Sequence, residues 1–171
     1  MTMKTGIKLA IIGALILGTS GLIFLVRTSA NEITITSGTA VGDTAVNLKF
    51  TTIDGSTFNL GDKRGKMVVV DFTTTSCPVC VEELKVLKQL ESDGSLVLVS
   101  VNVDGASLAD LQLFASHYEL SWEVGNSQQA GVDYKVSGVP TLLVIDRSGV
   151  IKYRGYYTDL EQLVHIINQD A

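Results

Sequence analysis

The 171-residue chain contains few cysteines and histidines, which are the usual ligands of zinc. It has two cysteines and two histidines, and His117 and His165 lie far apart in sequence, within separate helical patterns. Zinc usually takes four protein ligands, often at short and regular spacings, so this composition disfavours a structural zinc site. The net charge is −5. The sequence has no basic stripe, no glycine-rich phosphate loop and no internal repeat, which argues against nucleic acid as a partner.

Both cysteines and one of the two prolines lie together in residues 77–80, with the sequence Cys-Pro-Val-Cys. A mostly continuous apolar strand is predicted over 66–72 and an amphipathic helix over 78–92. The two sulfurs therefore lie at a helix N-terminus, where unpaired backbone N–H groups and the helix dipole favour the reactive thiolate. A disulfide between residues so close constrains the unfolded chain little, so the pair indicates redox exchange more strongly than a structural disulfide.

One long apolar segment lies near the N-terminus. About 18 consecutive uncharged, mostly apolar residues within 9–27 reach roughly 27 Å as a helix, close to the thickness of a hydrocarbon core. We therefore predict a transmembrane anchor over 9–27. Lys4 and Lys8 precede it, so the positive-inside rule predicts that residues 1–8 are cytoplasmic and that the rest of the chain is extracytoplasmic.

A cleaved signal peptide is the alternative to a retained anchor, because small residues follow at 28–30. The apolar stretch is longer than the usual core of roughly 7–15 residues in a signal peptide, and Arg27 directly precedes the candidate cleavage position, so an uncleaved anchor is favoured. No cysteine follows in a lipobox position, which argues against a lipid anchor. A polar linker over 28–39 and a single domain over 40–171 complete the predicted organisation.

Apolar patterning in the domain predicts an α/β fold with a mixed central sheet flanked by helices. Strands over 48–53 and 56–60 flank Asp54-Gly55, which is a strong hairpin signal. A strand over 95–103 follows the CxxC helix and completes a right-handed βαβ unit. The other predicted elements are helices over 107–117 and 128–134, strands over 120–124, 141–146 and 150–157, and a helix near the C-terminus.

The last predicted helix has both a start signal and an apolar face. Thr158 and Glu161, three residues apart, have the pattern of a capping box, so we expect Thr158 to cap the helix. Apolar residues then recur at helical spacing and are predicted to face the core: Leu160, Leu163, Val164 and Ile167.

Three stretches resemble the thioredoxin superfamily, and more narrowly the membrane-anchored TlpA/ResA-like thiol-disulfide oxidoreductases. They are Val70-Asp71-Phe72 before the CxxC pair, residues 138–142 (Gly-Val-Pro-Thr-Leu), and residues 107–134, which correspond to the helix-and-strand insert of that family. The resemblance covers about 39–168. It implies a thioredoxin-like fold with an N-terminal β-hairpin and a central helix-strand insert.

The resemblance also implies a substrate site. Pro140 corresponds to the cis-proline of the family, which faces the cysteines and leaves the preceding backbone free to pair with a bound peptide; the alternative is a proline that merely starts a strand. Val139 and Thr141 beside it are expected to flank the substrate. Pro78 and Val79, between the cysteines, are expected to contact it from the other side.

Two carboxyl groups match acidic positions of the family. Asp71, six residues before Cys77, matches the buried carboxylate of thioredoxin. Burial would raise its pKa and allow it to relay the proton of Cys80, whereas a solvated aspartate at a strand end would have no catalytic part. Glu83 matches the glutamate that follows the CxxC pair, although as a helix-surface residue it could equally be solvated.

The sequence departs from the family pattern at several positions. Residues 73–76 replace the aromatic residues usual before the first cysteine, and Val46 and Lys85 stand where the family has prolines. Thr74, three residues before Cys77, resembles the TxxC motif of peroxiredoxins, although the proline of that motif is missing. A thiol peroxidase is therefore one alternative function, and a Cu(I) metallochaperone is another because soft thiolates bind that ion.

The expected mechanism begins with Cys77 as the exposed nucleophile that attacks a substrate disulfide, and Cys80 then resolves the mixed disulfide. The redox-active Cys77–Cys80 disulfide is expected to serve without a further cofactor or metal. Pro78-Val79 supplies no cation or histidine to stabilise a thiolate, which favours a reductant over a strong oxidase. The resemblance implies a protein thiol or disulfide substrate, a membrane dithiol electron donor, and work such as cytochrome c biogenesis.

Overall fold

The computed structural model describes residues 37–91 and 94–169. At its centre is a five-stranded sheet in the order β7-β6-β5-β8-β9. β5 pairs in parallel with β6, and β6 with β7, while β8 and β9 are antiparallel to their neighbours. The sheet is therefore mixed, as the sequence predicts. Its strands are β5 Met67–Thr73, β6 Leu96–Asn102, β7 Glu123–Asn126, β8 Thr141–Ile145 and β9 Ile151–Gly155.

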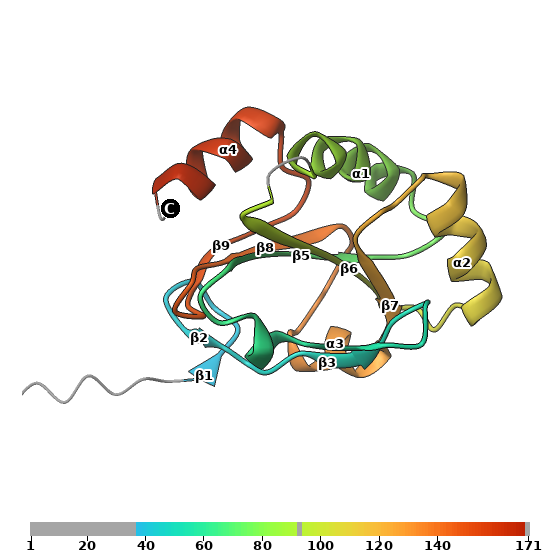
Figure 1. Cartoon of the computed structure of the whole chain (residues 1–171), viewed down its shortest axis with the longest axis horizontal. Helices are drawn as coiled ribbons and strands as arrows, with labels where there is room; N and C mark the ends of the chain where they lie inside the picture. The colour runs from blue at the N-terminus through green and yellow to red at the C-terminus, as the bar shows by residue number, and fades with distance from the viewer. Residues whose placement is uncertain (1–36, 92–93, 170–171) are drawn as a thin grey trace, which may run out of the picture. The chain divides into compact units, whose positions relative to one another are not determined.

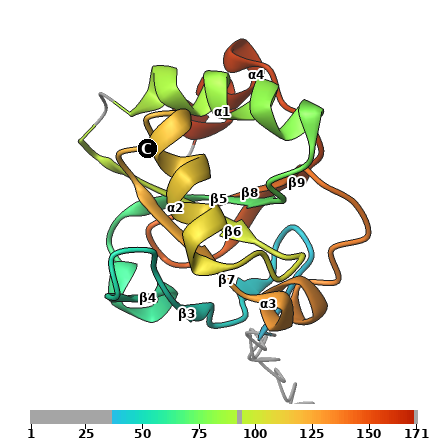
Figure 2. The same ribbon diagram turned by 90° about the vertical axis from the view of Figure 1, so that its right-hand side faces the viewer.

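Helices and a hairpin cover the two faces of this sheet (Figures 1 and 2). The helices α1 and α4 lie over one face, and α3 lies over the opposite face together with the hairpin of β3 and β4. The helix α2 precedes β7 and packs beside it. The bounds are α1 Pro78–Leu90, α2 Leu108–His117, α3 Gln128–Asp133, α4 Leu160–Gln169, β3 Lys49–Thr51 and β4 Thr57–Asn59.

Two short elements precede the hairpin, and a third follows it. Ser37–Gly38 (β1) pairs in parallel with Thr44–Ala45 (β2), so β1 lies within the segment predicted to be a linker. A 3-10 turn over Leu60–Lys63 leads into β5. These elements bring the chain across the lower part of the domain in Figure 1 before it enters the sheet.

The central strand β5 is buried along its whole length because both sides of the sheet are covered. Val68, Val70 and Phe72 pack with the hairpin and α3 in one cluster. Met67 and Val69 pack with α1 and α4 in the other cluster. Because side chains alternate along a strand, Asp71 faces the same side as Met67 and Val69, beneath α1.

The helix α4 starts differently from the prediction. Its cap is Asp159, whose Oδ1 accepts a hydrogen bond from the Gln162 N–H at 2.9 Å, so the capping box at Thr158 is wrong. Thr158 is fully buried and serves another contact described below. Leu163 and Ile167 are buried as predicted, but Val164 is 37% exposed, because the helix presents a narrower face to the sheet than the spacing suggested.

The hairpin and β7 meet at a glycine. A Cβ atom on Gly125 would lie 2.3 Å from the ring of Phe50 and 2.7 Å from the carbonyl oxygen of Thr51. Only glycine allows this approach, because real Cβ contacts are never so short. The hairpin is thereby held against the edge strand of the sheet, and Thr52 forms an antiparallel bridge with Gly125.

Residues 37–91 and 94–169 include no helix that is long and apolar enough to cross a bilayer. The predicted cytoplasmic segment 1–8 and anchor 9–27 lie outside the described residues, as does most of the predicted linker.

Candidate active site

The two cysteines lie at the N-terminus of α1 and are joined by a disulfide. Cys77 is the N-cap residue, and its Sγ accepts a hydrogen bond from the Cys80 N–H at 3.1 Å. Pro78 occupies the first turn, as predicted. Cys77 is half-buried whereas Cys80 is 0% exposed. A substrate can therefore reach the sulfur of Cys77 and not that of Cys80.

The loop before β8 faces these sulfurs. The Val139–Pro140 peptide bond is cis, as the resemblance implied. The carbonyl oxygen of Val139 lies 3.8 Å from Cys77 Sγ. Thr141 is buried, and its hydroxyl donates to the Gly138 carbonyl at 2.6 Å, which ties the two ends of the loop together. The structure thus brings the cysteine pair and the proline loop, which are about 60 residues apart in sequence, to one place.

Asp71 is completely buried, so the alternative of a solvated aspartate is wrong. The Ser100 hydroxyl donates to Asp71 Oδ2 at 3.0 Å, while Oδ1 is buried and has no hydrogen-bond partner among residues 37–91 and 94–169. Burial raises the pKa of Asp71 to about 7; the nearby Glu83 adds to this rise and the bond from Ser100 opposes it. A carboxyl group with such a pKa can exchange a proton near neutral pH.

Glu83 is also fully buried, so the alternative of a solvated helix surface is wrong as well. Its Oε2 accepts a hydrogen bond from the Thr158 backbone N–H at 2.9 Å, and its Oε1 has no hydrogen-bond partner in the described part of the chain. Burial raises the pKa of Glu83 to about 7 against the effect of this bond. The chain between β9 and α4 covers the side chain, which a helical pattern alone does not show.

The position of Glu83 nevertheless had a signal in the sequence. It follows Cys80 by three residues and precedes Leu87 by four, and residues at these spacings share one face of a helix. By contrast, Ser100 gave no functional signal. Ser100 is one polar residue in an apolar strand, and only the register of β5 and β6 shows that it lies opposite Asp71.

The remaining predicted positions lie in the loop before α1 and on the exposed surface of that helix. Thr74 is half-buried in the loop between β5 and α1, and Val79 is exposed between the two cysteines. Lys85, which replaces a family proline, is exposed and pairs with Glu82 at 2.7 Å. In the described part of the chain, no three His, Cys, Asp or Glu side chains gather to hold a metal ion.

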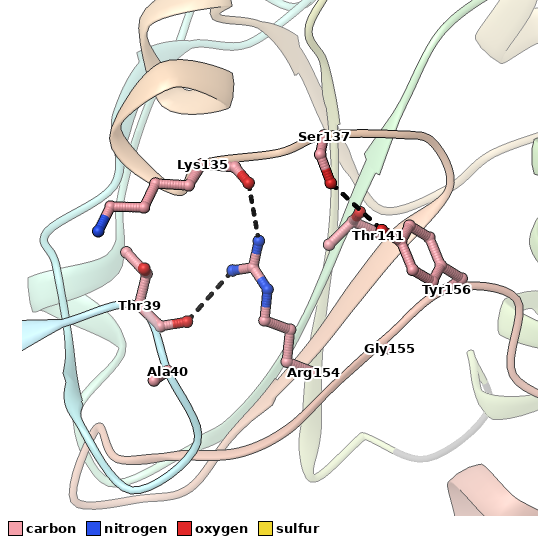
Figure 3. A pocket seen from close by; sticks show the side chains of 8 residues that line it. All are labelled: Thr39, Ala40, Lys135, Ser137, Thr141, Arg154, Gly155 and Tyr156. Carbon is pink, nitrogen blue, oxygen red and sulfur yellow. Dashed lines mark hydrogen bonds between the residues drawn. The ribbon is translucent and has the colours of Figure 1, made fainter.

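A pocket of about 520 Å³ opens beside the proline loop (Figure 3). The guanidinium group of Arg154 supports its wall by donating to the carbonyl oxygens of Thr39 at 3.2 Å and Lys135 at 3.3 Å. The Tyr156 hydroxyl lies 3.2 Å from Ser137 Oγ on the opposite side, and the tyrosine is 60% exposed. The lining residues are Thr39, Ala40, Lys135, Ser137, Thr141, Arg154, Gly155 and Tyr156.

This geometry agrees with the similarity of the chain to known proteins. Residues 41–154 match the AhpC/TSA family. The thiol-disulfide oxidoreductase ResA of Geobacillus thermodenitrificans is 31% identical over 129 residues, which cover 72% of this chain and 73% of that protein. The chain is a thiol-disulfide oxidoreductase of the AhpC/TSA family. Cys77 and Cys80, which form the disulfide at the start of α1, are the only cysteines of this chain.

Further comparisons agree with this assignment. The thioredoxin-like protein YneN of Bacillus subtilis is 29% identical over 120 residues, which cover 67% of this chain and 71% of that protein. Among solved structures, a thiol:disulfide interchange protein DsbE from Chlorobium tepidum has a TM-score of 0.69 at 24% identity, covering 77% of this chain and 97% of that chain. That structural likeness establishes the thioredoxin-like fold of this oxidoreductase.

Proposed function

We propose that this oxidoreductase reduces disulfides of proteins outside the cytoplasm. The observation that carries the proposal is the asymmetry of the cysteine pair. Cys77 caps α1 in reach of a substrate and faces the proline loop, while Cys80 is buried behind it together with two carboxyl groups. This arrangement supports one sulfur as nucleophile and the other as resolving group.

The reduced enzyme begins the reaction with the thiolate of Cys77. It attacks one sulfur of the substrate disulfide, whose S–S bond breaks as the new bond to Cys77 forms, and the released substrate thiolate takes up a proton. The thiolate of Cys80 then attacks Cys77 Sγ and releases the second substrate thiolate. Two electrons have passed to the substrate, which ends as a dithiol, and the enzyme ends as the Cys77–Cys80 disulfide.

The second step requires the buried Cys80 thiol to lose its proton. Cys80 is 0% exposed, so the proposed acceptor is a group within the protein rather than bulk water. Asp71 and Glu83 are buried carboxyl groups with pKa values raised to about 7, so each can accept a proton near neutral pH. Asp71 is the proposed acceptor, and the nearby Glu83 further raises the pKa of Asp71.

The same carboxyl groups bear on the direction of electron flow. A thiolate of Cys80 forms close to negative charge, since Glu83 lies one helical turn after it on the same face. This charge opposes the thiolate, and a poorly stabilised thiolate pair is a better reductant. Reduction of substrates is therefore favoured over strong oxidation.

The proposed location depends on the N-terminal segment. An uncharged stretch within residues 9–27, preceded by Lys4 and Lys8, supports an anchor with the enzyme domain outside the cytoplasm. Electrons would then come from a dithiol donor in the membrane. Cytochrome c biogenesis is one process that needs such a reductant.

The reduction potential of the Cys77/Cys80 pair tests the proposed direction. Equilibration with dithiothreitol or glutathione buffers is expected to give a potential nearer that of thioredoxin, about −270 mV, than that of DsbA, about −120 mV. A value near −120 mV would contradict the proposal.

Stopped-flow oxidation by hydrogen peroxide is expected to be slow, whereas fast stoichiometric oxidation would indicate a thiol peroxidase.

The pocket beside the proline loop supports a role in binding the substrate protein. Tyr156→Ala removes an exposed aromatic ring from its rim, and we expect KM for a protein disulfide to rise roughly 3- to 10-fold with little change in kcat. The exposed Leu113 of α2 offers a matched control, because Leu113→Ala also removes apolar surface. Equal KM values for the two variants would show that the pocket does not bind substrate.

A further inference from the structure

Three side chains form a hydrogen-bonded series on the face of the sheet that α1 and α4 cover. The Trp122 indole N–H donates to Ser100 Oγ at 3.0 Å, and the Ser100 hydroxyl donates to Asp71 Oδ2 at 3.0 Å. Asp71 and Ser100 are opposite each other in the register of β5 and β6. Trp122 lies two residues before Val124, which is the register partner of Ser100 on β7. Three neighbouring segments thus contribute one residue each.

The chemistry of the three groups fixes which one donates and which one accepts in each of the two hydrogen bonds. An indole N–H can only donate, so Ser100 Oγ must accept from Trp122. A serine hydroxyl has a single hydrogen, and Asp71 Oδ2 is the partner in reach for it. Oδ2 therefore acts as an acceptor. The other carboxyl oxygen, Oδ1, is buried and has no partner among the described residues.

We propose that Trp122 and Ser100 are positioning residues that decide where Asp71 carries its proton: Oδ2 is held as an acceptor, and the mobile proton resides on Oδ1. An ionised Oδ1 without a hydrogen bond is costly in a buried place, so this oxygen takes the proton first. The catalytic meaning of this assignment depends on the proposed role of Asp71, and the hydrogen-bond chain itself does not.

Few charged groups act on Asp71, so the effect of Ser100 on the pKa of Asp71 can be measured. Glu83 of α1 is the titratable group that acts on Asp71. The strand neighbours are uncharged, since β6 presents Ser100 and β8 presents Leu142 opposite Asp71. A hydrogen bond to a carboxylate is stronger than one to the neutral acid, so Ser100 favours ionisation. Its removal is expected to make Asp71 a weaker acid.

The experiment follows Asp71 directly by ¹³C NMR of its carboxyl carbon, as a function of pH, in the oxidised full-length protein in detergent. Ser100→Ala is expected to raise the titration midpoint by about one pH unit. Trp122→Phe is expected to raise it by less, because Ser100 keeps its hydroxyl but loses the N–H that orients it. Ser100→Thr restores a hydroxyl and is expected to return the midpoint toward that of the wild type.

Trp122 supplies a second and independent readout because it is the only tryptophan of the chain. Its fluorescence is expected to change with pH at the midpoint of Asp71, and to lose that change in Asp71→Asn and in Ser100→Ala. Thr73→Val is the matched control. It removes a buried hydroxyl of β5 that has no hydrogen-bond partner among the described residues, and we expect it to leave the midpoint unchanged.

An unchanged or lowered midpoint in Ser100→Ala overturns the proposal, as does a fluorescence change that persists in Asp71→Asn. The pH dependence of disulfide exchange separates this result from the proposed function. If the carboxyl midpoint moves as expected but the exchange profile does not, the hydrogen-bond chain stands. In that case the proposed role of Asp71 in disulfide exchange is wrong.

Discussion

Cys80→Ser is expected to accumulate a stable mixed disulfide between Cys77 and the substrate protein, while Cys77→Ser forms no adduct. Without the buried sulfur the first exchange still proceeds, because Cys77 is accessible at the N-terminus of α1. The adduct cannot be resolved from within the protein. Both variants are expected to lose multiple-turnover reduction of insulin by more than about 1,000-fold, since each removes one half of a dithiol reaction.

Non-reducing electrophoresis and mass spectrometry distinguish the two variants. Ser76→Ala is the matched control because it alters a hydroxyl beside Cys77 without touching a sulfur, and it is expected to retain turnover. If either cysteine variant kept wild-type turnover, the dithiol mechanism would be refuted. An adduct formed by Cys77→Ser instead of Cys80→Ser would reverse the assigned roles.

The stability of the oxidised protein is expected to fall as the pH rises from 4 to 8. The folded pKa of Asp71 is about 7, above the ordinary value of 3.8. A raised pKa means that the folded state holds its proton more tightly, so the stabilising contribution is full below pH 4 and is lost as the pH rises through 7. The loss for Asp71 is of the order of 4 kcal/mol, and ionisation of Glu83 adds to it.

Asp71→Asn is expected to remove most of this pH dependence and to make the protein more stable at pH 8. The amide has a similar shape and can still accept the bond from Ser100, but it carries no buried charge. Glu83→Gln is expected to give a smaller gain, because the Thr158 N–H already stabilises the charged form. Urea unfolding at pH 4.5, 6 and 8 measures both effects.

An exposed acid serves as a control for whether burial of the carboxyl group causes the pH dependence of stability. Asp62 is exposed in the 3-10 turn, and Asp62→Asn is expected to leave the slope of stability against pH unchanged. If Asp71→Asn instead proved less stable at pH 8 and kept the wild-type slope, Asp71 would be ionised in the folded protein at neutral pH. Its proposed part in proton transfer would then be lost.

Much of the fold and of the site could be predicted because the signals are local. Continuous apolar residues predicted a strand over 66–72, and β5 is that strand, buried along its whole length. The helix predicted over 107–117 is α2, and Ser107 caps it, with its Oγ accepting from the Asp110 N–H at 3.1 Å. The cis bond before Pro140 was predicted from resemblance to a family. Composition alone makes a cis bond a minority state.

The sequence left an assignment open, or gave a wrong one, where a distant segment decides the environment of a residue. Glu83 has a charge that suits solvent, but the chain between β9 and α4 covers it and supplies the N–H of Thr158. Thr158 has the pattern of a helix cap, but this same contact engages its backbone and leaves the cap to Asp159. Local propensity is overridden in both places by tertiary packing.

The cysteine pair, its place at a helix start and the strand that carries Asp71 follow from the order of residues, because strand and helix periods and caps act over a few residues. Three features follow from the register of β5 with β6 and from the packing of loops far apart in sequence. They are the pairing of Asp71 Oδ2 with Ser100, the bond from the Thr158 N–H to Glu83, and the approach of Val139 to Cys77. Such contacts depend on how whole elements meet, and no local pattern encodes them.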